Sequence, residues 1–141
     1  LDIRIRQMVG AQLWPIYRTR QHQLVLAAWS SGYPDPNAMA ETFIVNPDNA
    51  DDALLTGRPA WRNAWYAPEL NRLALRAGAE RGEVQRERLY LQLQKRFFEE
   101  SPLIILFQSR ERIAVRSNLR GLHAHTFGLD LSDMRKVGLR P

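Results

Sequence analysis

Two stretches in the middle of the chain place apolar residues at helical spacing. The first begins at Pro68 and has apolar residues at positions i, i+3, i+4 and i+7, which are Leu70, Leu73, Ala74 and Ala77. The second spans residues 83–99 and repeats an apolar residue every four positions, at Leu89, Leu93 and Phe97. Both patterns predict amphipathic helices that bury one face in a common core.

Two shorter helices are predicted closer to the amino end. Asp35 followed by Pro36 is typical of an N-cap with proline at the first helical position, which predicts a helix over residues 37–45. Residues 12–20 have helical composition, and Pro15 fits best in the first turn of that helix. The polar stretch 46–62 is predicted to be a long irregular connection.

Other apolar positions form short continuous or alternating runs, which predict β-strands. Residues 23–29 and 103–107 are nearly continuous apolar runs, as in strands that are buried on both faces. Residues 3–5 alternate apolar and polar side chains, and residues 113–115 form a shorter candidate strand. Because these strands alternate with the helices, the sequence predicts an α/β fold with a mixed sheet flanked by helices.

Composition narrows the class of protein. The chain has 141 residues, of which 45% are hydrophobic and 25% charged, so we expect one soluble globular domain over residues 1–141. No apolar run approaches the roughly 20 residues that span a bilayer. The absence of cysteine excludes disulfides, thiolate metal sites and cysteine nucleophiles.

The charge balance raises one alternative function. Lys and Arg total 20 against 15 acidic residues, which gives a formal net charge of +5. An arginine-rich nucleic-acid-binding domain is therefore an alternative. The arginines are scattered along the chain, however, which is more typical of solvated surfaces with weak ion pairs.

Catalytic and metal motifs are weak. Ser31 follows a predicted strand but lacks the G-x-S-x-G turn of a nucleophile, and no phosphate-binding glycine motif occurs. The pair His123 and His125 would need a further ligand for a metal, and the nearest carboxylates are Asp130 and Asp133. We therefore expect no enzyme, no metal and no cofactor.

Several aromatic residues lie in or beside predicted loops, where core aromatics are less expected. They are Trp29, Tyr33, Trp61, Trp65 and Tyr66. Trp29 ends a predicted strand, which is where α/β folds place ligand sites. These side chains either line a ligand site or cover the core beneath long loops, and the sequence leaves both interpretations open.

The order of motifs resembles a known family. Residues 29–36 read W-S-S-G-Y-P-D-P and resemble the W-x-x-D-Y-x-D-P segment of family 5 extracellular solute-binding proteins, the peptide and nickel receptors of bacterial ABC importers. Residues 65–70 match the aromatic, Pro and leucine-striped helix that follow. Residues 86–94 read R-E-R-L-Y-L-Q-L-Q, residues 100–108 match the Pro and hydrophobic strand, and residues 115–121 match the closing strand and N-x-x-G.

This resemblance implies a receptor that binds a solute without chemistry. The chain, which opens at Leu1 within a strand-like pattern, would be the C-terminal lobe of a longer exported protein with a type II periplasmic-binding-protein fold. Its last stretch of about 20 residues would return toward the missing N-terminal lobe. The receptor would be periplasmic or lipid-anchored, and it would capture a peptide or similar small solute in a cleft between two lobes and deliver it to the permease subunits.

The resemblance also implies the ligand-binding residues. Trp29 matches the tryptophan that packs beside the ligand, and Ser30 and Ser31 match a segment whose backbone lies against a bound peptide. Trp65 falls where the family often has Tyr, either lining the cleft or supporting its loop. Tyr33 and Gly32 of the segment 29–36 complete the set. Residues 35–36 match a structural turn and helix cap.

Two positions depart from the family pattern. Gly32 stands where peptide-binding members have an Asp that pairs with the ligand's free α-amino group. Either another carboxylate replaces it, or the ligand has no buried ammonium group there, and we favour the second. Asn71 stands where the family commonly has Asp on a helix face, with no obvious functional cost.

Overall fold

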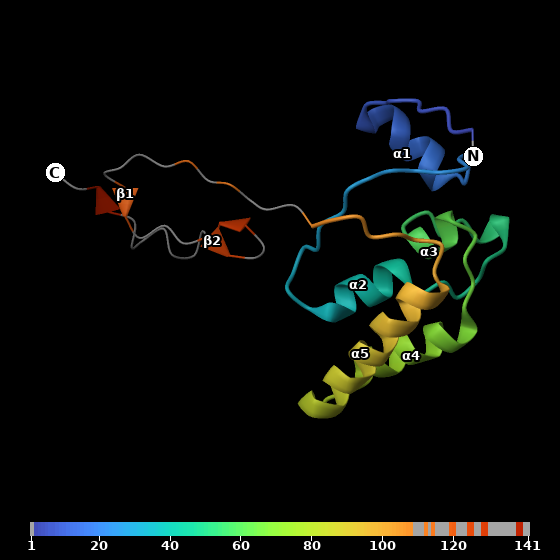
Figure 1. Cartoon of the computed structure of the whole chain (residues 1–141). Helices are drawn as coiled ribbons and strands as arrows, with labels where there is room; N and C mark the ends of the chain where they lie inside the picture. Colours follow the sequence, from blue (N-terminus) through green and yellow to red (C-terminus); the bar gives the residue numbers. More distant parts are fainter. Residues whose placement is uncertain are drawn as a thin grey trace. The chain divides into compact units, whose positions relative to one another are not determined.

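The structure is a computed structural model that describes residues 2–108, 112, 114, 119–120, 124–125, 128–129 and 138–139 (Figure 1). The helices run in chain order, and they are α1 (Gly10–Arg18), α2 (Pro36–Phe43), the short 3₁₀ helix η1 (Asp51–Ala53), α3 (Pro59–Arg62), α4 (Pro68–Ala79) and α5 (Glu83–Glu100). None of the described helices is both long and apolar enough to cross a membrane.

The chain divides into two compact units. The first contains Leu1–Ser30 and Asp35–Ile104, and the second contains Ser31–Pro34 and Ile105–Pro141. All the described helices belong to the first unit.

The second unit contains two antiparallel ladders with two residues per strand. Strand β1 (Leu119–Arg120) pairs with β4 (Gly138–Leu139), so that Leu119 lies opposite Leu139. Strand β2 (Ala124–His125) pairs with β3 (Gly128–Leu129), with His125 opposite Gly128.

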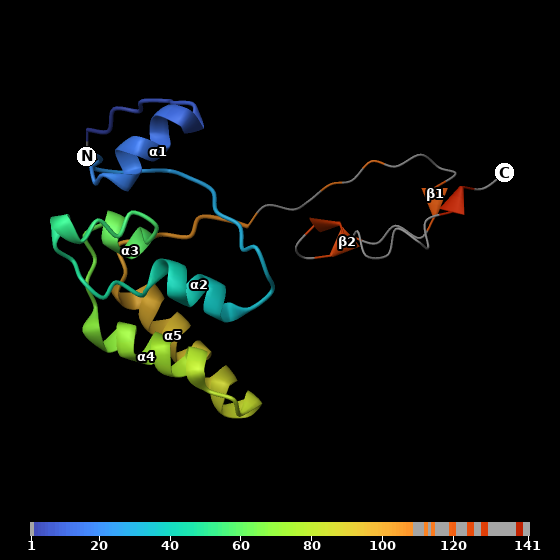
Figure 2. The same cartoon turned by 180° about the vertical axis from the view of Figure 1, so that it is seen from behind.

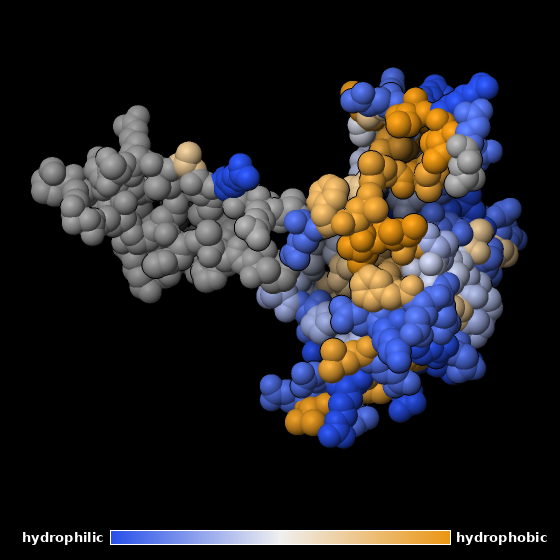
Figure 3. Space-filling model, viewed as in Figure 1, coloured by the Kyte–Doolittle hydropathy of each residue, from blue (hydrophilic) through white to orange (hydrophobic). Residues whose placement is uncertain are grey.

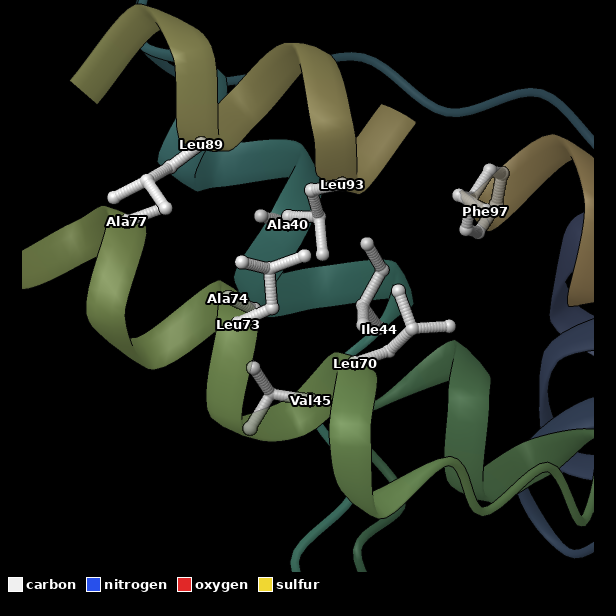
Figure 4. Close-up of a cluster of buried hydrophobic side chains, with 10 residues drawn as sticks. All are labelled: Ala40, Ile44, Val45, Leu70, Leu73, Ala74, Ala77, Leu89, Leu93 and Phe97. Carbon is white, nitrogen blue, oxygen red and sulfur yellow. The ribbon is translucent and has the colours of Figure 1, made fainter. Parts of the chain in front are cut away.

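The core of the helical unit lies between α2, α4 and α5. Figures 1 and 2 show these helices side by side from opposite directions, and α4 contacts both α2 and α5. The close-up in Figure 4 shows the buried cluster: Ala40, Ile44, Val45, Leu70, Leu73, Ala74, Ala77, Leu89, Leu93 and Phe97. The apolar stripes predicted for α4 and α5 are therefore confirmed, because all seven of their residues are buried here.

Prolines set where three of the helices begin. Pro36, Pro59 and Pro68 each occupy the first position of a helix, where a missing N–H removes no hydrogen bond. The predicted cap of α2 is confirmed, since the carboxylate of Asp35 accepts a hydrogen bond from the backbone N–H of Asn37 at 2.7 Å. The predicted position of Pro15 is wrong, because α1 begins at Gly10 and places Pro15 inside the helix.

The predicted α/β fold with a mixed sheet flanked by helices, the lobe of a type II periplasmic-binding-protein fold, is wrong for the described residues. They form a small helical unit and the two short ladders. Residues 3–5, 23–29 and 103–107 are not strands, and the region 113–115 lies outside the described residues apart from Ala114.

The predicted strands at residues 23–29 and 103–107 do not form because these segments have no pairing partner among the described residues. No backbone hydrogen bond joins residues 23–29 or residues 103–107 to another described segment. A strand exists only when a neighbour completes its ladder, and an apolar run by itself does not supply that neighbour. Side chains that were predicted to be buried in these strands are instead exposed, with Leu24 at 77% and Ile104 at 82%.

The polar connection 46–62 is more ordered than the sequence predicts. It contains η1 and α3. The guanidinium of Arg20, about 30 to 40 residues earlier in the sequence, bonds to several residues of this connection. Arg20 donates to the carbonyls of Trp61 at 2.6 Å and Asn49 at 3.1 Å, pairs with Asp51 at 2.6 Å, and stacks 3.8 Å from the centre of the Trp61 ring. Trp61 lies in α3 and is 2% exposed, so this aromatic residue is buried in the core and does not line an open site.

Candidate functional site

The candidate site begins where the extended chain meets α2. The ring of Trp29 packs edge-on against Phe43 of α2, with 5.0 Å between the ring centroids and 84° between the planes. Phe43 in turn packs against the buried cluster. Trp29 nevertheless keeps 44% of its surface exposed. One part of the indole thus contacts the helical unit while another part is exposed to solvent.

Asp35, six residues after Trp29, contacts both α2 and α5. Besides capping α2 through Asn37, its two carboxylate oxygens accept hydrogen bonds from the Nη2 of Arg86 on α5, at 2.8 and 3.0 Å. The Asn37 N–H is the larger cause and Arg86 the next, and together they lower the pKa of Asp35 below its ordinary value against the opposing effect of burial. Asp35 is therefore a charged, fully engaged carboxylate at neutral pH.

Tyr90 extends this contact by one turn of α5. Its hydroxyl donates to the Oδ1 of Asn37 at 3.1 Å and accepts from Arg86 at 3.4 Å. The guanidinium carbon of Arg86 lies 4.9 Å from the centre of the Tyr90 ring. Arg86 and Tyr90 are four residues apart and so share a helix face. We call Asp35, Asn37, Arg86 and Tyr90 the α2–α5 clamp.

The residues between Trp29 and Asp35 present polar atoms and little bulk. Ser30, Gly32 and Tyr33 are exposed, and Ser31 is half-buried. The hydroxyl of Ser31 donates to the carbonyl of Tyr33 and accepts from its N–H at 3.3 Å, which makes a local side-chain turn. A Cβ atom built on Gly32 would meet nothing within 4 Å, so the space beside this residue is open.

Trp65 differs from the rest of the predicted site. Its half-buried ring packs against the buried cluster and lies edge-on to Phe97, with ring centroids 5.8 Å apart. The carbonyl of Trp65 accepts from the Nδ2 of Asn46 at 2.9 Å. No hydrogen bond or ring contact of the described residues joins Trp65 to residues 29–33. Trp65 therefore packs against the core, and its role as a ligand-binding residue stays a prediction.

A shallow groove of about 340 Å³ lies elsewhere, between α2 and α4. Its lining residues are Asn37, Glu41, Val45, Ala74, Leu75, Gly78 and Ala79. None of the predicted ligand-binding residues lines this groove. It touches the clamp only through Asn37.

The described contacts supply no catalytic or metal arrangement at this site. The hydroxyl of Ser31 has backbone atoms of Tyr33 as its partners, and no histidine contacts it in the part of the chain that the structure describes. No group of three His, Asp or Glu side chains comes together among the described residues. His123, Asp130 and Asp133 lie outside the described residues, and so does the side chain of His125.

In the sequence, Arg86 and Tyr90 belong only to the family-like pattern of residues 86–94, which assigns them no role in the site. Their contribution depends on the pairing of α5 with the start of α2, which joins residues 51 positions apart. The i, i+4 spacing of an arginine and a tyrosine was the available signal.

Comparison of the chain with protein-family models, with curated proteins and with solved structures finds no match.

Proposed function

We propose that the chain is part of the substrate-binding component of a bacterial ABC importer and that residues 29–33 contact a peptide or similar small solute. The motif order suggests this function, and one structural observation supports it best. Ser30, Gly32 and Tyr33 are exposed, while Trp29 packs on α2 and Asp35, two residues after the segment, is held by α5.

An exposed segment with fixed ends suits recognition of a ligand. Trp29 offers a large rigid apolar surface, and Tyr33, with 50% exposure, offers a second. Ser30 and Gly32 leave their backbone accessible to hydrogen bonding with an extended solute. Because the ends are already ordered, binding loses less conformational entropy than it would in a loop that must first fold.

In this proposal a second lobe of the same receptor completes the ligand site. Large apolar side chains of the helical unit stay exposed on unpaired segments, among them Ile5, Leu24, Leu26 and Ile104. Figure 3 shows hydrophobic side chains gathered on the face of the helical unit where the extended chain after α1 runs. Contiguous apolar surface of this kind usually contacts another protein part. The loaded receptor, outside the cytoplasmic membrane, would then deliver the solute to the permease subunits.

The charge around Gly32 suggests the ligand class. Gly32 carries no carboxylate, and the nearest acidic residue in sequence, Asp35, is engaged by Arg86 and Asn37. A ligand ammonium group at this position would lack a counter-charge from residues 29–35 and would lose hydration without compensation. We therefore propose a solute without a free amine at this point, such as a blocked peptide.

The arginine-rich nucleic-acid domain has weaker support. Five arginines of the described residues, namely Arg20, Arg58, Arg72, Arg86 and Arg96, pair with carboxylates. Guanidinium groups that are already paired offer less charge to phosphates. Binding that weakens steeply with rising salt would nevertheless identify a nucleic-acid binder.

A calorimetric panel on the whole receptor tests the proposal. The panel contains dipeptides and tripeptides, each with a free amine and again with an N-acetyl group. We expect the N-acetylated forms to bind more tightly than the free forms, because Gly32 supplies no counter-charge. Tight binding of the free-amine peptides that acetylation abolishes would contradict the proposed ligand class, and binding of no member would contradict peptide capture.

A further inference from the structure

We propose that Arg62 and Arg18, together with the hydroxyl of Tyr17, bind a small oxyanion, namely the phosphate or carboxylate group of a solute. The three residues lie at the ends of α1 and α3, and all belong to the first compact unit. The site shares no residue with the segment 29–33, so neither proposal depends on the other.

Arg62 holds a charged guanidinium in a half-buried, oriented position. Its Nε donates to the carbonyl of Thr56 at 2.7 Å, and its guanidinium carbon lies 4.8 Å from the centre of the Tyr17 ring. Tyr17 is itself 7% exposed, so the ring is a firmly packed surface. The bond to Thr56 uses only Nε, which leaves the two Nη groups in the forked geometry that carboxylates and phosphates accept.

No carboxylate of the described residues pairs with Arg62. Arg20 shows the contrast, because its guanidinium bonds two carbonyls and also pairs with Asp51 at 2.6 Å. Burial is the largest cause that lowers the pKa of Arg62; the Tyr17 hydroxyl opposes it, and the charge of Arg18 adds to it. The half-buried cation has therefore lost hydration without gaining a counter-charge, which a bound anion would supply.

Arg18 brings a second positive charge to the same place. It follows Tyr17 directly, its side chain is exposed, and within the described ranges it has no ion pair. Its charge acts on Arg62, since it helps to lower the pKa of that group. Two uncompensated cations repel each other, and an anion bound by both removes the repulsion.

The backbone gives these two arginines little to bond. Each is the last residue of a helix, where a basic side chain commonly bonds the final carbonyls. Other groups already occupy those carbonyls. The hydroxyl of Thr19 donates to the carbonyl of Pro15 at 2.8 Å, and the side-chain amide of Asn63 donates to that of Pro59 at 2.8 Å. The guanidinium groups are thus left for a partner from outside.

The hydroxyl of Tyr17 adds a neutral donor. Its oxygen accepts from the Nδ2 of Asn63 at 3.2 Å. The orientation of that amide is fixed, because the Nε2 of His22 lies 3.3 Å from its Oδ1. No hydrogen bond in the part of the chain that the structure describes uses the hydroxyl proton of Tyr17. This proton can therefore bond an oxyanion that Arg62 holds.

Arg58 is a matched control from the same connection, 46–62. Its side chain is also half-buried, but it pairs with Glu41 at 3.7 Å and donates to the carbonyls of Glu41 and Val45 at 3.1 and 3.2 Å. Arg58→Gln removes one positive charge from an arginine that already has a counter-charge. A difference between Arg62→Gln and Arg58→Gln therefore reports the site and not the net charge of the protein.

An NMR titration of the full chain at constant ionic strength tests the site, with the side-chain amide of Asn63 as the local probe. Inorganic phosphate is added in one arm and acetate in the other. We expect a saturable shift with a dissociation constant of about 1 mM for at least one anion. Arg62→Gln should weaken that binding by about tenfold or more, and Arg58→Gln should leave it unchanged. The anion that binds more tightly identifies the solute group as phosphate or carboxylate.

No saturable shift at Asn63 with either anion would overturn the inference, as would equal weakening in Arg58→Gln and Arg62→Gln. If Arg62→Gln does not fold, Arg18→Gln serves in its place, since this side chain is exposed and its loss leaves no cavity. Binding that weakens by about threefold or more in Arg18→Gln supports the site, and unchanged binding overturns it.

Discussion

Asn46 and Asn71 show how a buried polar pair can replace apolar packing. The backbone N–H of Asn46 donates to the Oδ1 of Asn71 at 3.0 Å, and the Nδ2 of Asn71 donates to the carbonyl of Asn46 at 2.7 Å. Both residues are buried, with exposures of 0% and 8%. An amide can both donate and accept, which a carboxylate cannot do. Asn71 therefore joins α4 to the end of α2, a structural role that its position on a helix face did not indicate.

Asp35 makes the helical unit sensitive to acid. Its pKa is lower in the folded state than in the unfolded chain, where it is about 3.9. The folded state therefore binds this proton less readily, so the stabilisation is complete above the unfolded pKa and is lost as pH falls through the folded pKa. We expect the free energy of unfolding to fall between about pH 5 and pH 2, with a smaller fall in Asp35→Asn.

Denaturant unfolding followed by circular dichroism across this pH range measures the effect. Arg96→Gln, which leaves Asp35 and its partners intact, is the control and should keep the wild-type slope over the Asp35 titration. Equal slopes in the wild type and Asp35→Asn would show that this carboxyl does not couple protonation to folding.

At the residue scale, local patterns predicted the cap at Asp35 but not which aromatic side chains pack on the core. Tryptophan at position 29 and the cap at Asp35 were identified from local patterns, and the structure shows Trp29 half-exposed and Asp35 capping α2. Trp65 was placed with the site but packs on Phe97. Whether a loop aromatic covers a core or faces outward depends on tertiary packing, which neither spacing nor composition reports.

At the scale of elements, helices were predictable because their signals are local. Proline and a capping residue mark the start of α2, and the 3.6-residue period marks the buried faces of α4 and α5. Strands were not predictable, because their stability depends on a partner elsewhere in the chain. The apolar run at residues 23–29 shows the difference, since it is extended but has no partner among the described segments.

The two faces of α5 give a sharp test of its packing. Leu93 is 2% exposed and lies in the buried cluster, whereas Leu91 is 58% exposed on the same helix. Leu93→Ala should destabilise the protein by about 2–5 kcal/mol, because it leaves a cavity. Leu91→Ala should change stability by no more than about 0.5 kcal/mol.

Chemical denaturation of the two variants measures this difference, and the identical substitution on one helix removes differences in helix propensity. Similar losses in both variants would mean that α5 does not bury the face described here.

At the scale of the whole molecule, the proposed function depends on which side chains of the helical unit are exposed. Its main buried cluster lies between α2, α4 and α5, and its segments outside the helices keep large apolar side chains exposed. The sequence suggested the family-like order of motifs but could not reveal that the predicted sheet is absent from the described residues. The proposed binding segment comes from the motif order, and the structure shows that Trp29 packs on α2, that Asp35 pairs with Arg86, and that Ser30, Gly32 and Tyr33 are exposed.

The most direct test of the proposed function is the affinity of the protein for N-acetylated tripeptides, measured by calorimetry in Trp29→Ala and Tyr66→Ala. The two aromatics have similar exposure, 44% and 50%, but only Trp29 belongs to the proposed binding segment. We expect Trp29→Ala to weaken binding by more than about 1 kcal/mol, as for a buried aromatic anchor, and Tyr66→Ala to leave it unchanged. Unchanged affinity in Trp29→Ala, with a lowered melting temperature, would contradict the account and show that Trp29 only packs on Phe43.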